Sequence, residues 1–299
     1  MPIPIQRAAR CFDWFLFESC DPRIASLLRI GYGILLIVYV LVWMLDGPLW
    51  FSDEGVLRTS TVRQLNEHSS IFSIALTKVT PLAVRICLAV LFGQAVLLTL
   101  GCWSRLQAGC VFIWLAAFQD RNPMIVDGED TVFRWFAFLM IFLPLDHVWS
   151  LARRITGKLS LATCEHAWGL RLIQIQIAAI YLSSVACKLC GETWRDGTAL
   201  FFVARLDDYF GRFWVPDALF ETSWSVQTMT WSVLAIELLV PLTIWFPRCR
   251  MPALLSALVM HLAIEYSMNL FLFQWIMILG LMSFVKLPQA KGISNAMPV

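Results

Sequence analysis

Long apolar runs constrain this chain more than any other feature of its sequence. An α-helix needs roughly 20 apolar residues to cross a bilayer, and runs of about that length cover residues 25–45, 80–101, 105–119, 130–149, 168–190, 227–246, 250–268 and 269–287. Charged residues make up only 15% of the 299 residues, whereas soluble domains carry roughly 25%. The sequence therefore predicts an all-α, polytopic transmembrane helix bundle of about eight spans with no separate soluble domain.

The loops between these runs predict an orientation and a domain plan. If the N-terminus is cytoplasmic, more lysines and arginines fall in the cytoplasmic segments than in the outer segments, as the positive-inside rule requires. These residues are Arg7, Arg10, Arg23, Arg105, Arg153, Arg154, Lys158, Arg248, Arg250, Lys286 and Lys291. We expect an interfacial amphipathic helix over 1–24, a transmembrane domain over 25–288 and a cytoplasmic tail over 289–299. The lipid bilayer is the expected partner, and nothing in the composition points to nucleic acid.

The fifth run carries a polar stripe. Gln174, Tyr181 and Lys188 are seven residues apart, so they drift only about 20° per step around a helix. Such a stripe must face protein or water, because lipid cannot satisfy its hydrogen bonds. A lysine within a spanning segment is by default a functional-site hypothesis. The alternative is that Lys188 only reaches toward the headgroups from the helix end.

The fourth run begins with paired charges. Asp130 precedes Arg134 by four residues, and Asp127 precedes Asp130 by three. An acid followed by a base at this spacing forms an ion pair on one helix face. Asp130 is thus a candidate site residue; the alternative is a capped helix start with a purely structural ion pair, in which carboxylates complement the helix dipole.

The sixth and seventh runs add buried ionisable groups. His261 and Glu265 are four residues apart, so the carboxylate is expected to orient the imidazole; a satisfied core histidine is the alternative. Glu237 precedes Pro241 by four residues, and proline leaves the carbonyl of Glu237 without its helical partner. We interpret Glu237 as a cavity wall with Arg85 as its candidate counter-charge.

These groups converge on one expected site. With both termini cytoplasmic, Asp130, Lys188, His261 and Glu265 all lie in the outer half of the membrane, which predicts a polar site opening outward. The histidines and carboxylates do not form a metal-ligand pattern, so we expect no metal. Cys187-x-x-Cys190 lies at a helix C-terminus, where the dipole disfavours a thiolate, and points away from Lys188. We infer neither a redox role nor a disulfide framework.

Several motifs, taken in order, resemble the HTTM family, the membrane proteins related to the vitamin K-dependent γ-carboxylase. The resemblance covers about residues 20–288 and rests on Arg29-Ile-Gly-Tyr-Gly, Phe51-Ser-Asp-Glu-Gly-Val-Leu, Arg121-Asn-Pro, Asp127-Gly-Glu-Asp, Tyr181…Lys188-Leu189…Trp194-Arg-Asp-Gly-Thr-Ala-Leu, Glu237…Pro241 and His261. Lys188-Leu189 matches the position of the carboxylase lysine that deprotonates vitamin K hydroquinone. The resemblance therefore implies Lys188 as a base in an outward-facing cavity, and a quinone or vitamin K-like hydroquinone as cofactor.

The sequence also departs from the carboxylase. No counterpart of its large lumenal domain is expected, Cys187 replaces a lysine, and Glu129 and Asp130 stand where it has a histidine. By size the chain resembles the compact bacterial members, such as the sporulation-delay-type proteins, which act with a small partner protein on a secreted peptide. That resemblance implies a multi-pass protein of the bacterial inner (plasma) membrane.

Two functions are thus expected from the sequence. The first is a membrane enzyme that modifies a peptide or a lipid-soluble molecule such as a quinol. Its expected catalytic residues are Lys188, His261, Glu265 and Asp130, and its expected substrate-binding residues are Gln174, Tyr181, Trp194, Arg134 and Glu237. The second is a non-catalytic component for maturation or export of a secreted peptide, acting with a partner protein. A transporter is less favoured because no internal repeat is visible.

Overall fold

The computed structural model describes residue 13 and residues 15–18, 21–65, 79–157 and 167–287. Within these ranges the backbone is helical, apart from loops and one isolated β-bridge between Phe210 and Met268. The predicted all-α fold is therefore confirmed. The chain divides into two compact units, which are Met1–Leu172 with Val285–Val299 (unit 1) and Ile173–Phe284 (unit 2).

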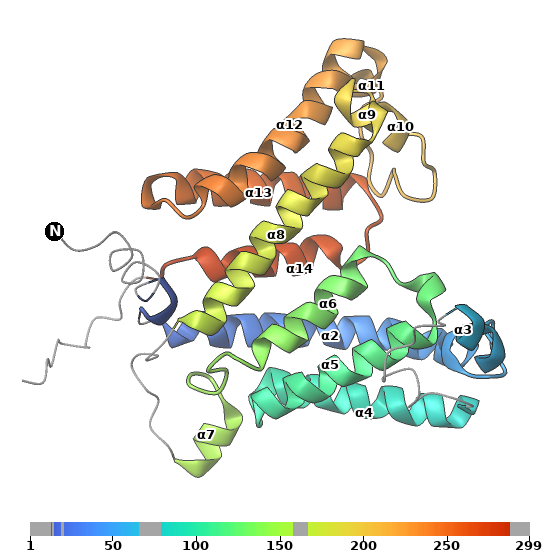
Figure 1. The fold of residues 1–299 in the computed structure, drawn as a ribbon, viewed down its shortest axis with the longest axis vertical. Helices are drawn as coiled ribbons and strands as arrows, with labels where there is room; N and C mark the ends of the chain where they lie inside the picture. The colour runs from blue at the N-terminus through green and yellow to red at the C-terminus, as the bar shows by residue number, and fades with distance from the viewer. Residues whose placement is uncertain (1–12, 14, 19–20, 66–78, 158–166, 288–299) are drawn as a thin grey trace, which may run out of the picture. The chain divides into compact units, whose positions relative to one another are not determined.

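Unit 1 is built around a long first helix. Its elements are α2 (Pro22–Phe51), α3 (Thr59–Leu65), α4 (Pro81–Leu100), α5 (Ser104–Arg121), η2 (Pro123–Ile125), α6 (Gly128–Met140) and α7 (Leu151–Thr156). Asp21 and Thr80 cap α2 and α4, and a proline follows each cap at the first helical position, where its missing N–H costs nothing. Helices α2, α4 and α5 lie side by side (Figure 1), and α5 also packs on α6.

Small residues let the helices of unit 1 approach closely. A Cβ atom on Gly33 of α2 would lie 2.1 Å from Thr99 Oγ1 of α4, so only glycine fits at this crossing. Tyr32 is fully buried, and its hydroxyl donates to the carbonyl of Phe133 in α6 over 2.9 Å. Helix α2 is thereby fixed to both α4 and α6.

Two helices of unit 1 differ from the predicted runs. Helix α6 ends at Met140 rather than near 149, because Pro144 has no N–H and disfavours helical geometry in the residue before it. At 13 residues and about 1.5 Å per residue, α6 is shorter than the hydrocarbon core of a bilayer. Helix α2 continues past the predicted end at residue 45, through a kink at Asp46 just before Gly47 and Pro48.

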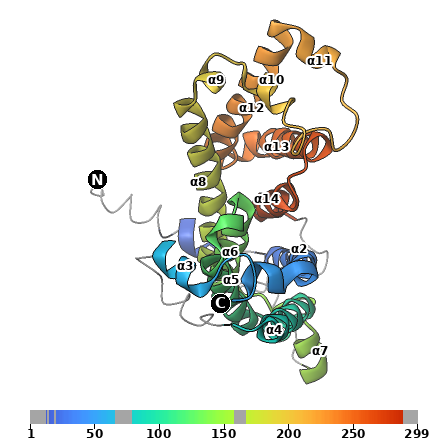
Figure 2. The same ribbon diagram turned by 90° about the vertical axis from the view of Figure 1, so that its right-hand side faces the viewer.

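Unit 2 holds the rest of α8 (Trp168–Cys190), which begins in unit 1, together with α9 (Glu192–Arg195), α10 (Ala199–Val203), α11 (Ala218–Glu221), α12 (Ser223–Thr243), α13 (Pro247–Ser267), α14 (Phe273–Leu281) and η3 (Met282–Phe284). Helix α13 packs on α12 and α14, and α10 and α11 pack on α12. Figure 2 shows the short helices α9, α10 and α11 gathered at one end of this unit.

The outer faces of the helices identify a membrane protein. Four helices, α2, α4, α8 and α12, are long and apolar enough to cross a bilayer. On α4, for example, Leu82, Ile86, Val90 and Leu97 are exposed at helical spacing, which suits a surface that faces lipid. Each of the eight predicted runs overlaps a described helix, although the number of crossings and the orientation stay predictions. Most of the expected 1–24 helix and the whole of the 289–299 tail lie outside the described residues.

Candidate functional site

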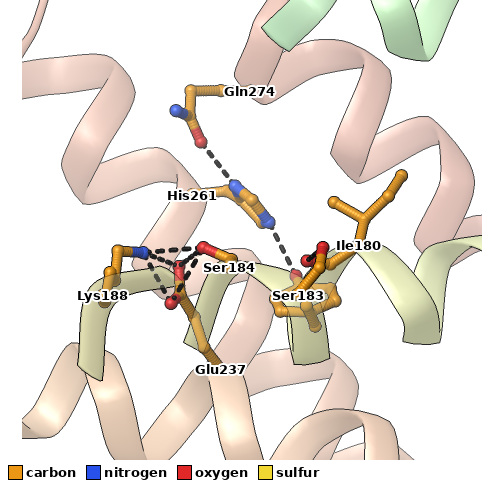
Figure 3. Close-up of polar contacts among 8 residues, drawn as sticks. Ile180, Ser183, Ser184, Lys188, Glu237, His261 and Gln274 are labelled. Atoms are coloured by element: carbon orange, nitrogen blue, oxygen red, sulfur yellow. Dashed lines mark hydrogen bonds and ion pairs between the residues drawn. The ribbon is translucent and has the colours of Figure 1, made fainter. Parts of the chain in front are cut away.

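Lys188 lies in a cluster of polar side chains within unit 2, as Figure 3 shows. Its Nζ donates to both carboxylate oxygens of Glu237 on α12 and, over 2.9 Å, to Ser184 Oγ one turn earlier on α8. It also lies 5.0 Å from the centre of the Trp194 ring, within reach of a cation–π interaction. We call Lys188, Glu237, Ser184 and Trp194 the Lys188 cluster.

The ion pair in this cluster is largely removed from solvent. The side chains of Lys188 and Glu237 are 22% and 9% exposed. The prediction that Arg85 is the counter-charge of Glu237 was wrong. Lys188 supplies that positive charge, and Arg85 is exposed on α4 of unit 1. A carboxyl in an apolar helix stays ionised only with a cation within a few ångströms, and only the three-dimensional structure shows that Lys188 is the cation within reach.

A second set of side chains, the Tyr181 relay, consists of Tyr181, His261 and Gln274. The Tyr181 hydroxyl lies 2.6 Å from His261 Nε2, and His261 Nδ1 bonds Gln274 Oε1. Because an amide oxygen accepts hydrogen bonds, Nδ1 carries the imidazole proton, and Nε2 of the neutral ring accepts from the tyrosine hydroxyl. All three residues are at least 97% buried. The relay therefore holds His261 in a single tautomer.

Glu265 does not orient His261, so that prediction was wrong. Its carboxylate pairs with Arg212 and accepts a hydrogen bond from Trp275 Nε1 over 3.0 Å. Arg212 reaches it because the preceding residue, Gly211, is bonded through its N–H to the carbonyl of Ser267 over 2.8 Å. Helical spacing relates His261 and Glu265, but it contains no information about this returning loop.

The stripe on α8 faces inward as predicted, and its members have different partners. Gln174 is 4% exposed and donates to the carbonyl of Ser283 over 2.6 Å, so it ties α8 to η3. Tyr181 belongs to the Tyr181 relay, and Lys188 belongs to the Lys188 cluster. Cys187 and Cys190 are exposed free thiols on the same helix, away from the buried face that carries the stripe.

Asp130 and Arg134 belong to unit 1. Asp130 accepts hydrogen bonds from the Tyr39 hydroxyl and, over 2.8 Å, from the N–H of Asp127, completing a capping box at the start of α6. Among the described residues no ion pair joins Asp130 to Arg134. The capped helix start is therefore confirmed and the ion pair was wrong. Participation of Asp130 in the Lys188 site stays a prediction.

Ser184, Gln274 and Arg212 were missing from the predicted site residues. Ser184 follows Tyr181 by three residues and precedes Lys188 by four, a spacing that signals a shared face. Gln274 and Arg212 carry no comparable signal, because their partners lie on other elements. Within the described part of the chain, no group of three or more His, Cys, Asp or Glu side chains could hold a metal ion.

Comparison with known proteins agrees with this arrangement of motifs. Residues 17–288 match the model of the HTTM domain. An uncharacterised protein of Bacillus subtilis (strain 168), YitO, is 27% identical over 200 residues, which is 64% of this chain and 62% of YitO. This chain thus spans about six tenths of the length of YitO. No solved structure matches this chain. With its apolar helices and a family match over most of its length, this chain belongs to the HTTM family of integral membrane proteins.

Proposed function

We propose that the protein is a membrane-embedded enzyme in which Lys188 acts as a base on a peptide or on a lipid-soluble substrate such as a quinol. The observation that carries this proposal is the placement of the Lys188 ammonium between a carboxylate, a hydroxyl and an aromatic face. A structural lysine needs only one partner or access to headgroups. Three different partners instead hold this amine in one position, as a reacting group requires.

Glu237 supplies a means of turning Lys188 into a base. In an apolar environment the energy difference that favours an ammonium–carboxylate pair over a neutral amine and a neutral carboxylic acid becomes small. Transfer of one proton from Nζ to a Glu237 oxygen, already 2.5 Å apart, leaves a neutral amine beside a neutral carboxylic acid. The amine lone pair can then accept a proton from the substrate, which restores the ammonium and leaves a substrate anion beside it.

The Tyr181 relay offers a second proton acceptor on the same helix face. Tyr181 lies one turn before Ser184 on α8, and His261 Nε2 accepts from its hydroxyl. If the tyrosine oxygen accepts a proton, the hydroxyl proton of Tyr181 can pass to Nε2 of the His261 imidazole, so that the tyrosine stays neutral. The relay would remove protons from the Lys188 cluster, as a positioned general base does. In this proposal His261 and Tyr181 belong to the same site as Lys188.

A hydroquinone fits the chemistry of the described residues. It offers acidic hydroxyl protons and a flat apolar ring, while the Lys188 cluster offers an amine, a carboxylate and the face of Trp194. When bound, a hydroquinone would supply electrons and an oxygen anion. Lys188 would accept the hydroxyl proton and Trp194 would lie against the ring.

The test uses the full-length protein in liposomes with a naphthohydroquinone in air-saturated buffer, dissolved oxygen being the electron acceptor. Lys188→Ala should lower hydroquinone consumption by about 10²-fold or more, the usual contribution of a positioned base. Added ethylamine should restore part of the rate, since it replaces the missing amine. Lys286→Ala, which removes an exposed lysine, serves as the control. Full activity in Lys188→Ala, or loss that no amine restores, would contradict the base role.

The non-catalytic alternative has an observation of its own in its favour. Lys188 and Glu237 satisfy one another, as a structural ion pair inside a bundle would. A component that acts with a small partner protein on a secreted peptide needs only the folded bundle. In that case a double Lys188→Met/Glu237→Leu variant, which removes both charges, should still support secretion of the active peptide by bacteria. An enzyme that depends on Lys188 should lose its product in the same variant.

A further inference from the structure

Unit 1 contains a hollow that plays no part in the proposed reaction. Its volume is about 720 Å³, within the range of roughly 300–1,000 Å³ that small-molecule sites occupy. The wall consists of residues from the C-terminal end of α4, from the segment that leads into α7 and from α7 itself, among them His147, Trp149, Ser150, Leu151, Arg153 and Arg154. All of these residues belong to one compact unit.

The hollow has a positive wall. Arg153 and Arg154 line it directly, and a third arginine lies behind it. A Cβ atom on Gly101 would lie 1.6 Å from Arg29 Nη1 and 2.8 Å from the Cα of Ser150. The Arg29 guanidinium is therefore packed directly behind the surface that Ser150 forms.

The charge of Arg29 is only partly compensated. Its Nη2 donates to the carbonyl of Trp149 over 2.7 Å, and Asp146 lies 3.8 Å from Nη1. Arg29 is fully buried, and its Nε and Nη1 make no hydrogen bond to the described residues. Asp146 is already bonded to the backbone N–H and the hydroxyl of Ser104. The buried guanidinium of Arg29 thus keeps two nitrogens without a hydrogen bond among the described residues, and its charge adds to those of Arg153 and Arg154 at the wall.

The rim of the hollow is apolar and aromatic. Trp149 and Leu151 line it and are 55% and 38% exposed. Exposed tryptophan and aliphatic side chains beside arginines are typical of the headgroup level of a membrane, where one ligand offers both phosphate and acyl chain. A soluble anion would have no use for this apolar rim.

We propose that this hollow binds the phosphate of an anionic phospholipid headgroup. Arg153 and Arg154 contact the phosphate oxygens, for which the guanidinium fork is suited, and Arg29 adds its field from behind the wall. Trp149 and Leu151 contact the glycerol and the first part of the acyl chains. The expected orientation places Arg105, Arg153 and Arg154 on the cytoplasmic side, where anionic lipids attract such basic clusters.

The experiment compares lipids on the purified full-length protein in a neutral detergent. Native mass spectrometry counts bound phosphatidylglycerol and phosphatidylcholine, which share acyl chains and differ in headgroup charge, and inorganic phosphate is added as a competitor. Wild type should retain phosphatidylglycerol at least tenfold better than phosphatidylcholine. Arg153→Gln/Arg154→Gln should lose most of that preference, and Arg153→Lys/Arg154→Lys should keep more of it because the charge remains.

The matched control is Arg248→Gln/Lys286→Gln, which removes two exposed charges elsewhere in the chain and should leave the preference within twofold of wild type. Equal retention of the two lipids by wild type would overturn the proposal. So would an equal loss in the control variant. If millimolar inorganic phosphate removes the bound phosphatidylglycerol entirely, the hollow is a site for a soluble anion and the lipid assignment falls. An unchanged unfolding temperature of the Gln variant shows that the loss is one of binding.

Discussion

Lys188 and Glu237 are each unfavourable in an apolar helix and are stabilised by being together. The carboxylate is the more deeply placed partner, at 9% side-chain exposure, whereas Lys188 lies two residues before the end of α8 and is 22% exposed. The lysine can therefore reach water or the Trp194 ring if its partner is removed. Glu237 lies within α12 and is buried, so its carboxylate cannot reach water in the same way. Loss of the cation should accordingly cost more than loss of the anion.

This asymmetry can be measured with a double-mutant cycle. Lys188→Met leaves a buried carboxylate without its cation and should lower the free energy of unfolding by roughly 3 kcal/mol. Glu237→Leu should cost about 1 kcal/mol, because Lys188 keeps Ser184 and Trp194 as partners. The double variant should lose only about 2 kcal/mol instead of the additive sum of about 4, giving a coupling of about 2 kcal/mol in unfolding measured in detergent micelles. Additive single losses would show that the two side chains do not interact in the protein.

Helices were predictable as elements, whereas the contacts between them were not. Among the described residues, each long helix overlaps an apolar run of the sequence. Pro22 and Pro81 lie at the N-terminal ends of α2 and α4. The kink at Asp46 and the end of α6 at Met140 depend on single prolines within apolar stretches, where a hydrophobic pattern continues unchanged. On α8, heptad spacing correctly placed Tyr181 and Lys188 on the face that packs against other helices. Glu265 was assigned to His261 because a same-helix neighbour is visible in sequence, whereas Gln274 on α14 is not.

At the element scale, Asp53 joins the end of α2 to the start of α3. Its carboxylate accepts from the N–H of Thr59 over 2.6 Å. The side-chain hydrogen bond from Thr59, followed by its backbone N–H and the charge of Arg121, lowers the pKa of Asp53 below its usual 3.8. A carboxylate whose pKa is lower in the folded protein adds stability above the unfolded pKa. That contribution disappears as the pH falls through the folded pKa.

Asp53→Asn should therefore destabilise the protein at pH 7, and the difference from wild type should shrink as the pH falls below about 3.8. The check is the unfolding temperature of both proteins in detergent from pH 7 to pH 3. Glu54→Gln, an exposed change at the neighbouring position, should run parallel to wild type over the whole range. A constant gap between Asp53→Asn and wild type down to pH 3 would show that the carboxylate charge plays no part.

At the scale of the whole molecule, the orientation in the membrane decides which compartment the Lys188 site serves. In unit 2, Gln227 on the first turns of α12 donates to the carbonyl of Asp196 over 3.5 Å, and Tyr266 near the end of α13 donates to the carbonyl of Trp214 over 3.0 Å. The loops of 191–222 therefore gather where α8 ends. The turn between α12 and α13, at residues 244–246, lies at the other end of α12.

Substituted cysteines can read this orientation directly. In a cysteine-free background, Asp217→Cys and Arg248→Cys place single thiols at exposed positions on opposite ends of α12. With the proposed cytoplasmic termini, a membrane-impermeant maleimide should label Asp217→Cys in intact bacterial spheroplasts. It should reach Arg248→Cys only after permeabilisation, because the arginines of that turn are expected inside. The reverse pattern would put the end of α8 that carries Lys188 in the cytoplasm, and a secreted peptide could then meet that end only before its export.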